Sequence, residues 1–389
     1  MKKCYLLGHL QEFVPFLQRE DPVSLVYMKL SALADAEVRE RRDLIVKTDL
    51  TRVLVESTVR RTLKEMEGSP KRAVRNLVDL GLQFSSGRFQ TRLLATAQRM
   101  LGNSKSAYYD LVRHVATHVD HEIITGFGVN LGYNSCTKGA RLIRETEVQR
   151  GFNIPWALHL FINEEKLHAE PEFYPALLQE SKSLGIYTYL LFAQGDPEDL
   201  FPLLEQEPDC AFVLFVQGEQ VTDSFLEKLR HANHVMVSVK AGGKMLQACR
   251  RLQAQGRLYA VHDRYTEDNK GRVLSGQWLA SVLPAQPVFA FLRRDLSCGP
   301  QTRQEVYRYV TQVRDGQQYP LVCMEVEEGS LLIDQVISEG ECLVGFGGDG
   351  SLRTHEGFRK EEKFNIFHHS LEEVLGIASP KTAPRLVRS

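Results

Sequence analysis

The sequence of 389 residues has few cysteines, and no two of them are close neighbours. The seven cysteines are scattered and odd in number, and neither CxxC nor CxxxCxxC occurs. This distribution excludes a disulfide framework and any metal or iron–sulfur site held by neighbouring cysteines. We therefore expect reduced thiols in a cytoplasmic protein. The cysteines are Cys4, Cys136, Cys210, Cys249, Cys298, Cys323 and Cys342.

Long apolar runs and an excess of one charge are also missing. The chain is 43% hydrophobic and 25% charged, with a formal net charge of -1. No apolar run approaches the roughly 20 residues that a membrane-spanning helix needs. The composition predicts a globular protein of one or two domains that binds neither a membrane nor nucleic acid. Residues 138–150 could form a basic helix face, but Glu145 and Glu147 among its cations favour a solvated face.

Familiar nucleotide and catalytic motifs are absent as well. No GxGxxG follows the first predicted strand, which weakens a dinucleotide-binding interpretation. Residues 345–350 are rich in glycine, but no helix with Lys-Ser or Lys-Thr follows them. The Asp349-Gly350 pair instead predicts a β-hairpin turn. The sequence shows no nucleophile elbow, no paired-carboxylate site and no zinc-ligand spacing.

The stretch from Gly151 to Pro197 predicts one β-α-β unit. Residues 154–163 and 186–193 are mostly apolar, as in strands covered on both faces. Between them, residues 171–184 carry apolar side chains at helical spacing, and Gly185 is placed to end that helix. Two strands joined through a helix must run parallel, so the fold class is α/β.

The same alternation continues along the chain. Six or seven β-α units with short loops predict a partial or closed parallel barrel, with a doubly wound sheet as the alternative. We expect a helical N-terminal region at 1–150, the barrel at 151–335, and a C-terminal tail with a hairpin and a short helix at 336–389. The further predicted strands are 210–217, 234–240, 257–263, 287–293 and 321–326.

Several segments in order resemble those of the radical S-adenosylmethionine (radical SAM) proteins. The likeness runs from about Ala73 to Leu375 and is to the subgroup with a helical N-terminal region and a SPASM-like tail. It implies a partial (β/α) TIM-like barrel with its ligand site at the carboxyl ends of the strands. The segments are 151–156, 184–187, 194–197, 350–352, 365–366 and 370–375.

One departure from that family decides the functional expectation. In the family, the loop after the first strand carries CxxxCxxC, whose three thiolates hold a [4Fe–4S] cluster. Residues 164–170 stand at that place and contain no cysteine. Iron–sulfur clusters need soft thiolate ligands, which His168 and its flanking glutamates do not supply. In the tail, Cys342 matches one auxiliary-cluster position, whereas His355 stands near another.

The resemblance also indicates where a ligand would bind. Gln194, Gly195, Asp196 and Pro197 stand where the family has Gly-Gly-Glu-Pro, the turn that binds the amino group of S-adenosylmethionine. Gly195 and Pro197 match, Asp196 keeps a carboxylate, and Gln194 departs. At other strand ends, the cations Lys240, Arg264 and Arg293 favour an anionic ligand.

The resemblance therefore implies a radical SAM-like protein without its cluster ligands, which acts as a non-catalytic binding or partner subunit (a pseudoenzyme). The alternative is an enzyme that binds S-adenosylmethionine or an anionic nucleotide and works without a cluster or with that of a partner. The expected partners are a small anionic ligand or a cluster-bearing radical SAM homologue that docks on the helical region. A different α/β enzyme stays open as a further alternative.

Three other sets of residues each have a structural and a functional interpretation. We expect His159 to be a hydrogen-bonded core histidine rather than a ligand. His262 and Asp263 could form a base and its orienting carboxylate, but adjacent strand residues point to opposite faces. Cys323, Glu325 and Glu327 would share one strand face, where simple alternation explains them better than a metal site.

Overall fold

The computed structural model describes residues 50–381, apart from positions 67, 85, 86, 339 and 341. The chain divides into two compact units, Met1–Leu54 and Val55–Ser389, and the description below concerns the second. Cys4 and the first 49 residues of the predicted helical region lie outside the described residues. No helix among the described residues is long and apolar enough to cross a membrane.

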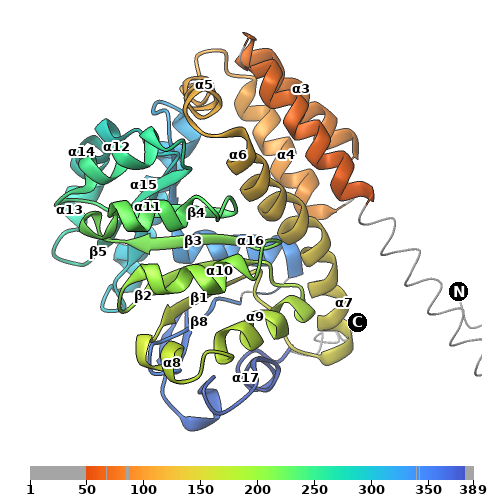
Figure 1. Cartoon of the computed structure of the whole chain (residues 1–389), viewed down its shortest axis with the longest axis vertical. Helices are drawn as coiled ribbons and strands as arrows, with labels where there is room; N and C mark the ends of the chain where they lie inside the picture. Colours follow the sequence, from red (N-terminus) through yellow and green to blue (C-terminus); the bar gives the residue numbers. More distant parts are fainter. Residues whose placement is uncertain (1–49, 67, 85–86, 339, 341, 382–389) are drawn as a thin grey trace, which may run out of the picture. The chain divides into compact units, whose positions relative to one another are not determined.

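The described residues form one sheet of ten strands (Figure 1). Its order is β10-β9-β8-β1-β2-β3-β4-β5-β6-β7. The eight strands from β8 to β7 run parallel, and β9 and β10 are antiparallel additions at one edge. The strands are β1 Ala157–Ile162, β2 Thr188–Ala193, β3 Ala211–Val216, β4 Val235–Lys240, β5 Tyr259–Tyr265, β6 Phe289–Arg294, β7 Val322–Glu325, β8 Val344–Phe346, β9 Leu352–Thr354 and β10 Gly357–Arg359.

This order is that of an eight-stranded (β/α) barrel opened between β7 and β8, which lie at opposite ends of the parallel series. The predicted α/β class and partial barrel are confirmed. The doubly wound alternative is wrong, because such a sheet reverses direction beside its first strand, whereas β1 to β7 follow one another without reversal.

Ring contacts show how strongly the sheet curls. Phe215 on β3 and Phe291 on β6 have ring centroids 6.2 Å apart, although two strands lie between them. In a flat sheet three strand spacings would separate them by about 14 Å. We call this concave side, which also carries His159 and Phe161 of β1, the inner face.

Helices cover the opposite, outer face of the sheet. Tyr189 on this face bonds to Ser181 of α9, and Tyr259 donates to the Ala285 carbonyl of η5. Central outer-face side chains such as Leu160 and Leu214 are completely buried, as expected for strands between two layers. The covering helices are α8 Glu164–Ala169, α9 Phe173–Leu184, η3 Pro197–Leu200, α10 Phe201–Glu205, η4 Gly218–Gln220, α11 Asp223–Leu229, α12 Met245–Ala254, α13 Lys270–Leu274, α14 Gln277–Val282, η5 Leu283–Ala285 and α15 Pro300–Gly316. The last helix of the series, α16 Val326–Ser338, instead contacts the inner face, where Gly329 lies against Met324 of β7 and Glu327 pairs with Arg353 of β9.

The helical region before β1 packs against the amino ends of the strands (Figure 1). Asn130 donates to the Cys210 carbonyl before β3 at 2.7 Å, and Asn134 donates to the Asp209 carbonyl at 2.7 Å. The helices are α3 Pro70–Phe84, α4 Arg88–Leu101, α5 Tyr108–His118, α6 His121–Val129, the π-helix η2 Asn130–Gly139 and α7 Ala140–Arg150. Between α6 and α7 the helix continues without interruption as the π-helix η2, which carries these asparagines.

The tail adds both the last parallel strand and the edge hairpin. β8 pairs in parallel with β1, and β9 returns antiparallel to β8, which confirms the predicted hairpin. The predicted short helix is α17 Leu371–Ala378, which Ser370 and Glu373 begin with a capping box. It follows η6 Glu362–Phe364. The tail thus shares the barrel sheet, and the domain boundary expected at 336 stays a prediction.

Candidate functional site

A belt of aromatic rings crosses the inner face near the carboxyl ends of the strands. Phe161 of β1 stacks on Phe192 of β2 at 4.6 Å between centroids, and Phe192 lies 4.3 Å from Phe215 of β3. His262 of β5 meets Phe215 edge-on at 4.9 Å. Register explains the belt, because Phe161, Phe192 and Phe215 are paired positions that must point to the same side.

Arg293 of β6 reaches across this belt. Its guanidinium carbon lies 3.8 Å from the ring centroid of Phe192 and 5.5 Å from that of Phe161. Burial lowers the pKa of Arg293 to about 10, with Glu327 opposing that shift and Arg353 adding to it. Its Nε has no hydrogen-bond partner among the described residues. A partly exposed guanidinium is thus held over aromatic faces without a bonded carboxylate at Nε.

A buried ion pair lies beside Arg293. Arg353 of β9 donates from Nη2 to Glu327 Oε1 at 2.8 Å, and the Arg294 backbone N–H donates to Glu327 Oε2 at 3.0 Å. Burial opposes ionisation of Glu327, but Arg353 and Arg293 lower its pKa to about 2. Glu327 is therefore a carboxylate at neutral pH. The second terminal nitrogen of Arg353, Nη1, has no partner within the described residues.

His159 lies beside this group of charged side chains. Its side chain is 1% exposed, and neither ring nitrogen has a hydrogen-bond partner in the described part of the chain. Burial, with the nearby positive charge of Arg353, lowers its pKa to about 3, so the ring is neutral at physiological pH. The expectation of a hydrogen-bonded core histidine is confirmed for the core position and wrong for the hydrogen bond, because neither ring nitrogen has a partner among the described residues.

The carboxylates around this group do not balance its cations. Glu325 lies on the outer face, where Tyr265 donates to it at 2.9 Å. Burial and the charge of Glu327 hold the pKa of Glu325 well above its ordinary range. Glu327 follows β7 on α16, so it does not share a strand face with Cys323 and Glu325, and that metal interpretation is wrong. Arg293 and Arg353 thus share one carboxylate.

The turn predicted from the family resemblance follows β2, at the carboxyl ends of the parallel strands. Gln194 and Asp196 are exposed, and Pro197 begins η3. Asp196 caps η3 by accepting from the Glu198 N–H at 3.0 Å. Gln194 packs against Gly348, where a side chain would collide with its amide. Asp196 and Gln194 thus already make contacts within the protein. The assignment of Gln194, Gly195, Asp196 and Pro197 to a cofactor stays a prediction.

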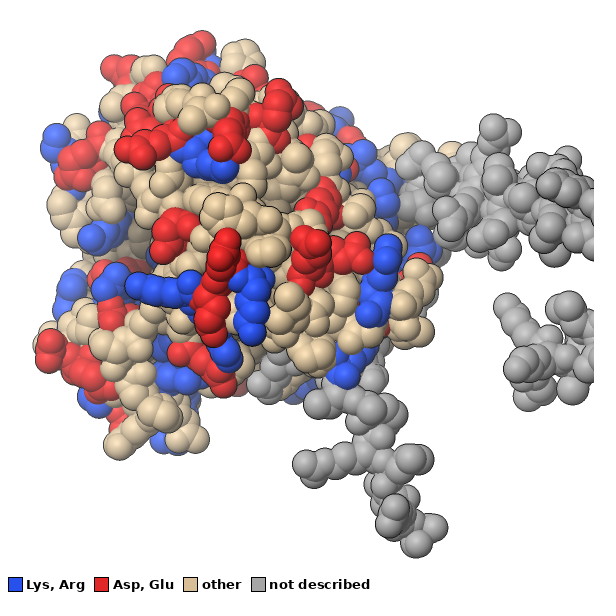
Figure 2. All heavy atoms as spheres, turned by 90° about the horizontal axis from the view of Figure 1, so that it is seen from below, with Lys and Arg blue, Asp and Glu red and all other residues tan. Residues whose placement is uncertain are grey.

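Two of the three predicted cations, Lys240 and Arg264, occupy different environments. Lys240 ends β4 with an exposed side chain, in register with His262. Arg264 of β5 is in register with Arg293 but pairs with Asp295, so Asp295 offsets its charge. Lys240, Arg264 and Arg293 therefore share the inner face near the carboxyl ends. Elsewhere, on the face shown in Figure 2, Lys and Arg side chains are interspersed with Asp and Glu.

The loop after β1 does not fit a [4Fe–4S] cluster. Asn163 caps α8 by accepting from the Lys166 N–H at 2.8 Å, and α8 contains no thiol. Among the described residues, two groups of three possible metal ligands lie within 4.8 Å, and neither has more than one cysteine. Burial also raises the pKa of Cys136 and Cys323 to about 12, which disfavours the thiolate that a cluster requires.

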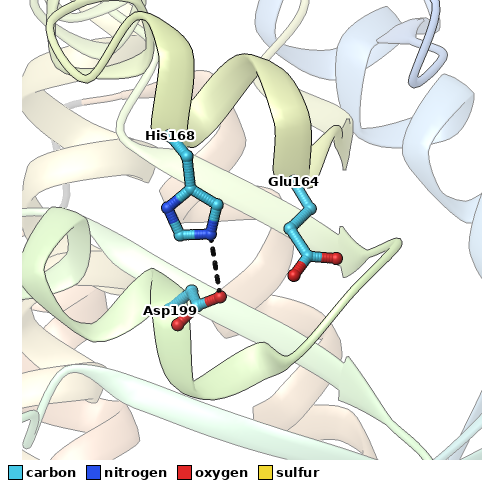
Figure 3. A group of neighbouring side chains, drawn as sticks. All are labelled: Glu164, His168 and Asp199. Atoms are coloured by element: carbon cyan, nitrogen blue, oxygen red, sulfur yellow. Dashed lines mark hydrogen bonds and ion pairs between the residues drawn. The ribbon is translucent and has the colours of Figure 1, made fainter.

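One of those two groups stands in the place of the cluster loop. Glu164 and His168 lie one turn apart on α8 and face Asp199 of η3 (Figure 3). His168 Nε2 lies 3.2 Å from Asp199 Oδ2. Glu164 and His168 are exposed, and the His168–Asp199 contact already pairs two of the three groups. Exposed acidic groups of this kind are common without an ion, so the group does not identify a metal centre.

His262 and Asp263 do not form a dyad. His262 Nδ1 lies 3.1 Å from Ser238 Oγ on the inner face, and its pKa is lowered to about 3 by burial and by Arg293. Asp263 is on the outer side, 3.9 Å from Arg272. Arg353 and Glu327 had no signal in the sequence that linked them to His159, because nearly 200 and 170 positions separate them along the chain.

No protein-family model and no curated protein matches the sequence. Among solved structures, SuiB of Streptococcus suis bound to the precursor peptide SuiA aligns with a TM-score of 0.42 and 11% identity, over 61% of this chain and 68% of that chain. SuiB bound to S-adenosylmethionine aligns with a TM-score of 0.40 and 10% identity, over 61% and 67% of the two chains. Values this low assign neither a family nor an activity to this chain.

Proposed function

We propose that this protein is a cluster-free relative of the radical SAM proteins that binds S-adenosylmethionine or an anionic nucleotide at the carboxyl ends of the strands of its half-barrel. The observation that carries the proposal is the loop after β1: a capped helix without cysteine stands there, between intact strands and beside an exposed Gln194–Pro197 turn. The fold supports it, since the carboxyl ends of parallel strands are where such folds bind ligands.

The ends of three strands meet around that turn. Asn163 after β1 donates to the Gly348 carbonyl at 2.8 Å, and Gln194 after β2 packs on the same glycine. Gly348 lies in the hairpin after β8. Lys240 supplies an exposed positive charge farther along the same edge. The Asp196 carboxylate would accept from the amino group of S-adenosylmethionine, and Lys240 would attract the carboxylate or phosphate of a ligand at the same edge of the sheet.

Calorimetry with S-adenosylmethionine tests the ligand. Binding by the full chain is expected, and Asp196→Asn should weaken it about tenfold, because the variant loses the charge but keeps a side chain that caps η3. Asp315→Asn, at an exposed position near the end of α15, is the matched control. Absence of binding, or equal affinity for Asp196→Asn, removes S-adenosylmethionine from the proposal.

Iron and sulfide analysis tests the cluster. Protein reconstituted without oxygen should hold no stoichiometric iron or sulfide, since the described thiols are dispersed and buried. A stoichiometric [4Fe–4S] signal would contradict the proposal.

If radical chemistry involves this chain, its cluster must come from a partner. The proposed partner is a cluster-bearing homologue, and the expected result is its co-purification with the tagged full chain from the native host. Recovery of the tagged chain alone counts against a partner subunit and leaves ligand binding as the function.

A further inference from the structure

We propose that His159, Arg293 and Arg353 form a second anion site, on the inner face, which binds an organic carboxylate with an apolar body. The site goes beyond the function proposed above, since none of its residues belongs to the Gln194–Pro197 turn. It would stand even if S-adenosylmethionine did not bind.

The first argument is a cluster of buried side-chain nitrogens without hydrogen-bond partners. His159 is 1% exposed and Arg353 is 3% exposed. Both ring nitrogens of His159, Nη1 of Arg353 and Nε of Arg293 have no hydrogen-bond partner among the described residues. Buried polar groups in native proteins are nearly always paired, so a cluster of four such atoms points to a missing acceptor.

The second argument is charge. Two guanidinium groups share the single carboxylate Glu327, which already accepts from Arg353 and from the Arg294 backbone. The next carboxyl group, Glu325, lies on the outer face of the sheet, where Tyr265 and the Glu328 backbone N–H donate to it. One positive charge is therefore uncompensated, and a ligand with one negative charge would neutralise it. A carboxylate fits because its two oxygens accept from two guanidinium groups at once.

The third argument concerns the rest of the ligand. The Arg293 guanidinium lies over Phe192 and within 5.6 Å of the Phe215 centroid, and Arg353 lies 5.7 Å from the Phe161 centroid. An anion bound between the two cations is thus surrounded by rings. Phe161 and Arg293 are only half-buried, so solvent reaches this part of the inner face. An apolar or aromatic body attached to the carboxylate would cover the exposed ring surface.

His159 would act as a neutral donor or acceptor to the bound carboxylate rather than as a charged partner. Its neutral state follows from burial beside two cations. One ring N–H can then donate to a carboxylate oxygen, and the tautomer is set by that bond. No bond is made or broken in this proposal; the site is a binding site.

Phenylacetate is the test ligand, and phenylacetamide is its neutral control of the same shape. Titrations of the full chain followed by ligand-observed NMR should detect phenylacetate but neither phenylacetamide nor inorganic phosphate. Arg293→Met should weaken phenylacetate binding about tenfold, the loss expected for one charge-assisted contact. Lys105→Met, at an exposed position between α4 and α5, should bind phenylacetate as the wild type does.

A second readout does not depend on any variant of the cations. Phenylacetate should shift the ring proton signals of His159 in the wild type, with the assignment taken from His159→Gln. The proposal is overturned by equal binding of phenylacetate and phenylacetamide, by preferred binding of phosphate, or by unshifted His159 signals at saturating phenylacetate. If Asp196→Asn bound S-adenosylmethionine as tightly as the wild type does, that result would contradict only the proposed site at the Gln194–Pro197 turn. The two proposals can therefore fail separately.

Discussion

Arg353 and Glu327 form a buried salt bridge that joins the C-terminal hairpin to the helix after the last strand of the central series. The Arg353 guanidinium donates to the Glu327 carboxylate at 2.8 Å, and both side chains are at most 4% exposed. The pair spans the opening of the barrel, since β9 lies beyond β8 and α16 follows β7. It therefore links the two ends of the parallel series, which hydrogen bonds between strands do not join.

Removal of one partner of this pair should destabilise the protein strongly. Arg353→Met leaves the Glu327 carboxylate buried without its cation, and we expect a loss of about 3–5 kcal/mol in the free energy of unfolding. The double variant Arg353→Met with Glu327→Gln removes both charges and should recover part of that loss. Urea denaturation of both proteins measures the difference. A single variant as stable as the double variant would show that Glu327 is not held as a buried anion.

Stability should fall in acid because His159 stays neutral in the folded state. Its folded pKa is about 3 against an ordinary value of 6.5, so the unfolded chain binds a proton that the folded chain does not. The sign is that of a lowered histidine pKa: stability is fully present above pH 6.5 and decreases as the pH falls from 6.5 to 3. The slope is at most about 1.4 kcal/mol per pH unit for this residue.

The comparison protein for this pH dependence is His159→Gln. It should show a shallower fall between pH 6.5 and 4.5, a range in which Glu327, whose pKa is lowered from 4.5 to about 2, still contributes fully to stability. Chemical denaturation at several pH values measures both curves. Parallel curves for the wild type and the variant would contradict a buried neutral His159.

Close backbone packing makes Gly139 sensitive to substitution. It lies at the end of the π-helix η2, where a side chain would collide with the Gly185 carbonyl and would lie 2.9 Å from the Asn134 carbonyl. Neither backbone oxygen can rotate away, so Gly139→Ala should cost at least about 1–3 kcal/mol. The matched control is Gly132→Ala in the same helix, where no atom lies within 4 Å.

Gly132→Ala should be neutral or stabilising by up to about 1 kcal/mol, because alanine restricts the unfolded chain and favours a helix. Thermal and urea unfolding of the two variants gives the comparison. Similar stabilities would show that the end of η2 is not in the described contact with Gly185, the residue that ends α9.

The described cysteines should react slowly in the folded protein. Burial raises the pKa of Cys136, Cys249 and Cys323 to about 12, so the reactive thiolate is scarce at pH 8. Mass spectrometry after brief treatment with iodoacetamide should find these three unmodified in the native protein and modified after denaturation in guanidinium chloride. Rapid native modification of any of them would contradict its burial.

Local patterns were sufficient for most of the fold. Apolar runs bounded by turn residues predicted every parallel strand from β1 to β7 within a few positions, and Gly185, with φ of 102°, ends α9 as expected. Asp349-Gly350 marked the hairpin of the tail. These features depend on residues that are close together in the sequence, so short segments of the chain are enough to predict them. The π-helix η2 was missed because its asparagines are satisfied by the carbonyls of residues 208–210, far along the sequence.

The sequence alone established a parallel α/β protein whose first strand is followed by a loop without thiolates, because strand pattern, chain connectivity and residue type are all local properties. Only the tertiary structure decided which charges meet. The curl of the sheet carries Arg293 from β6 to Phe192 on β2, and the tail hairpin brings Arg353 beside Glu327 and His159. Contacts of this kind depend on strand register and curvature summed over the whole sheet, and no short segment contains them.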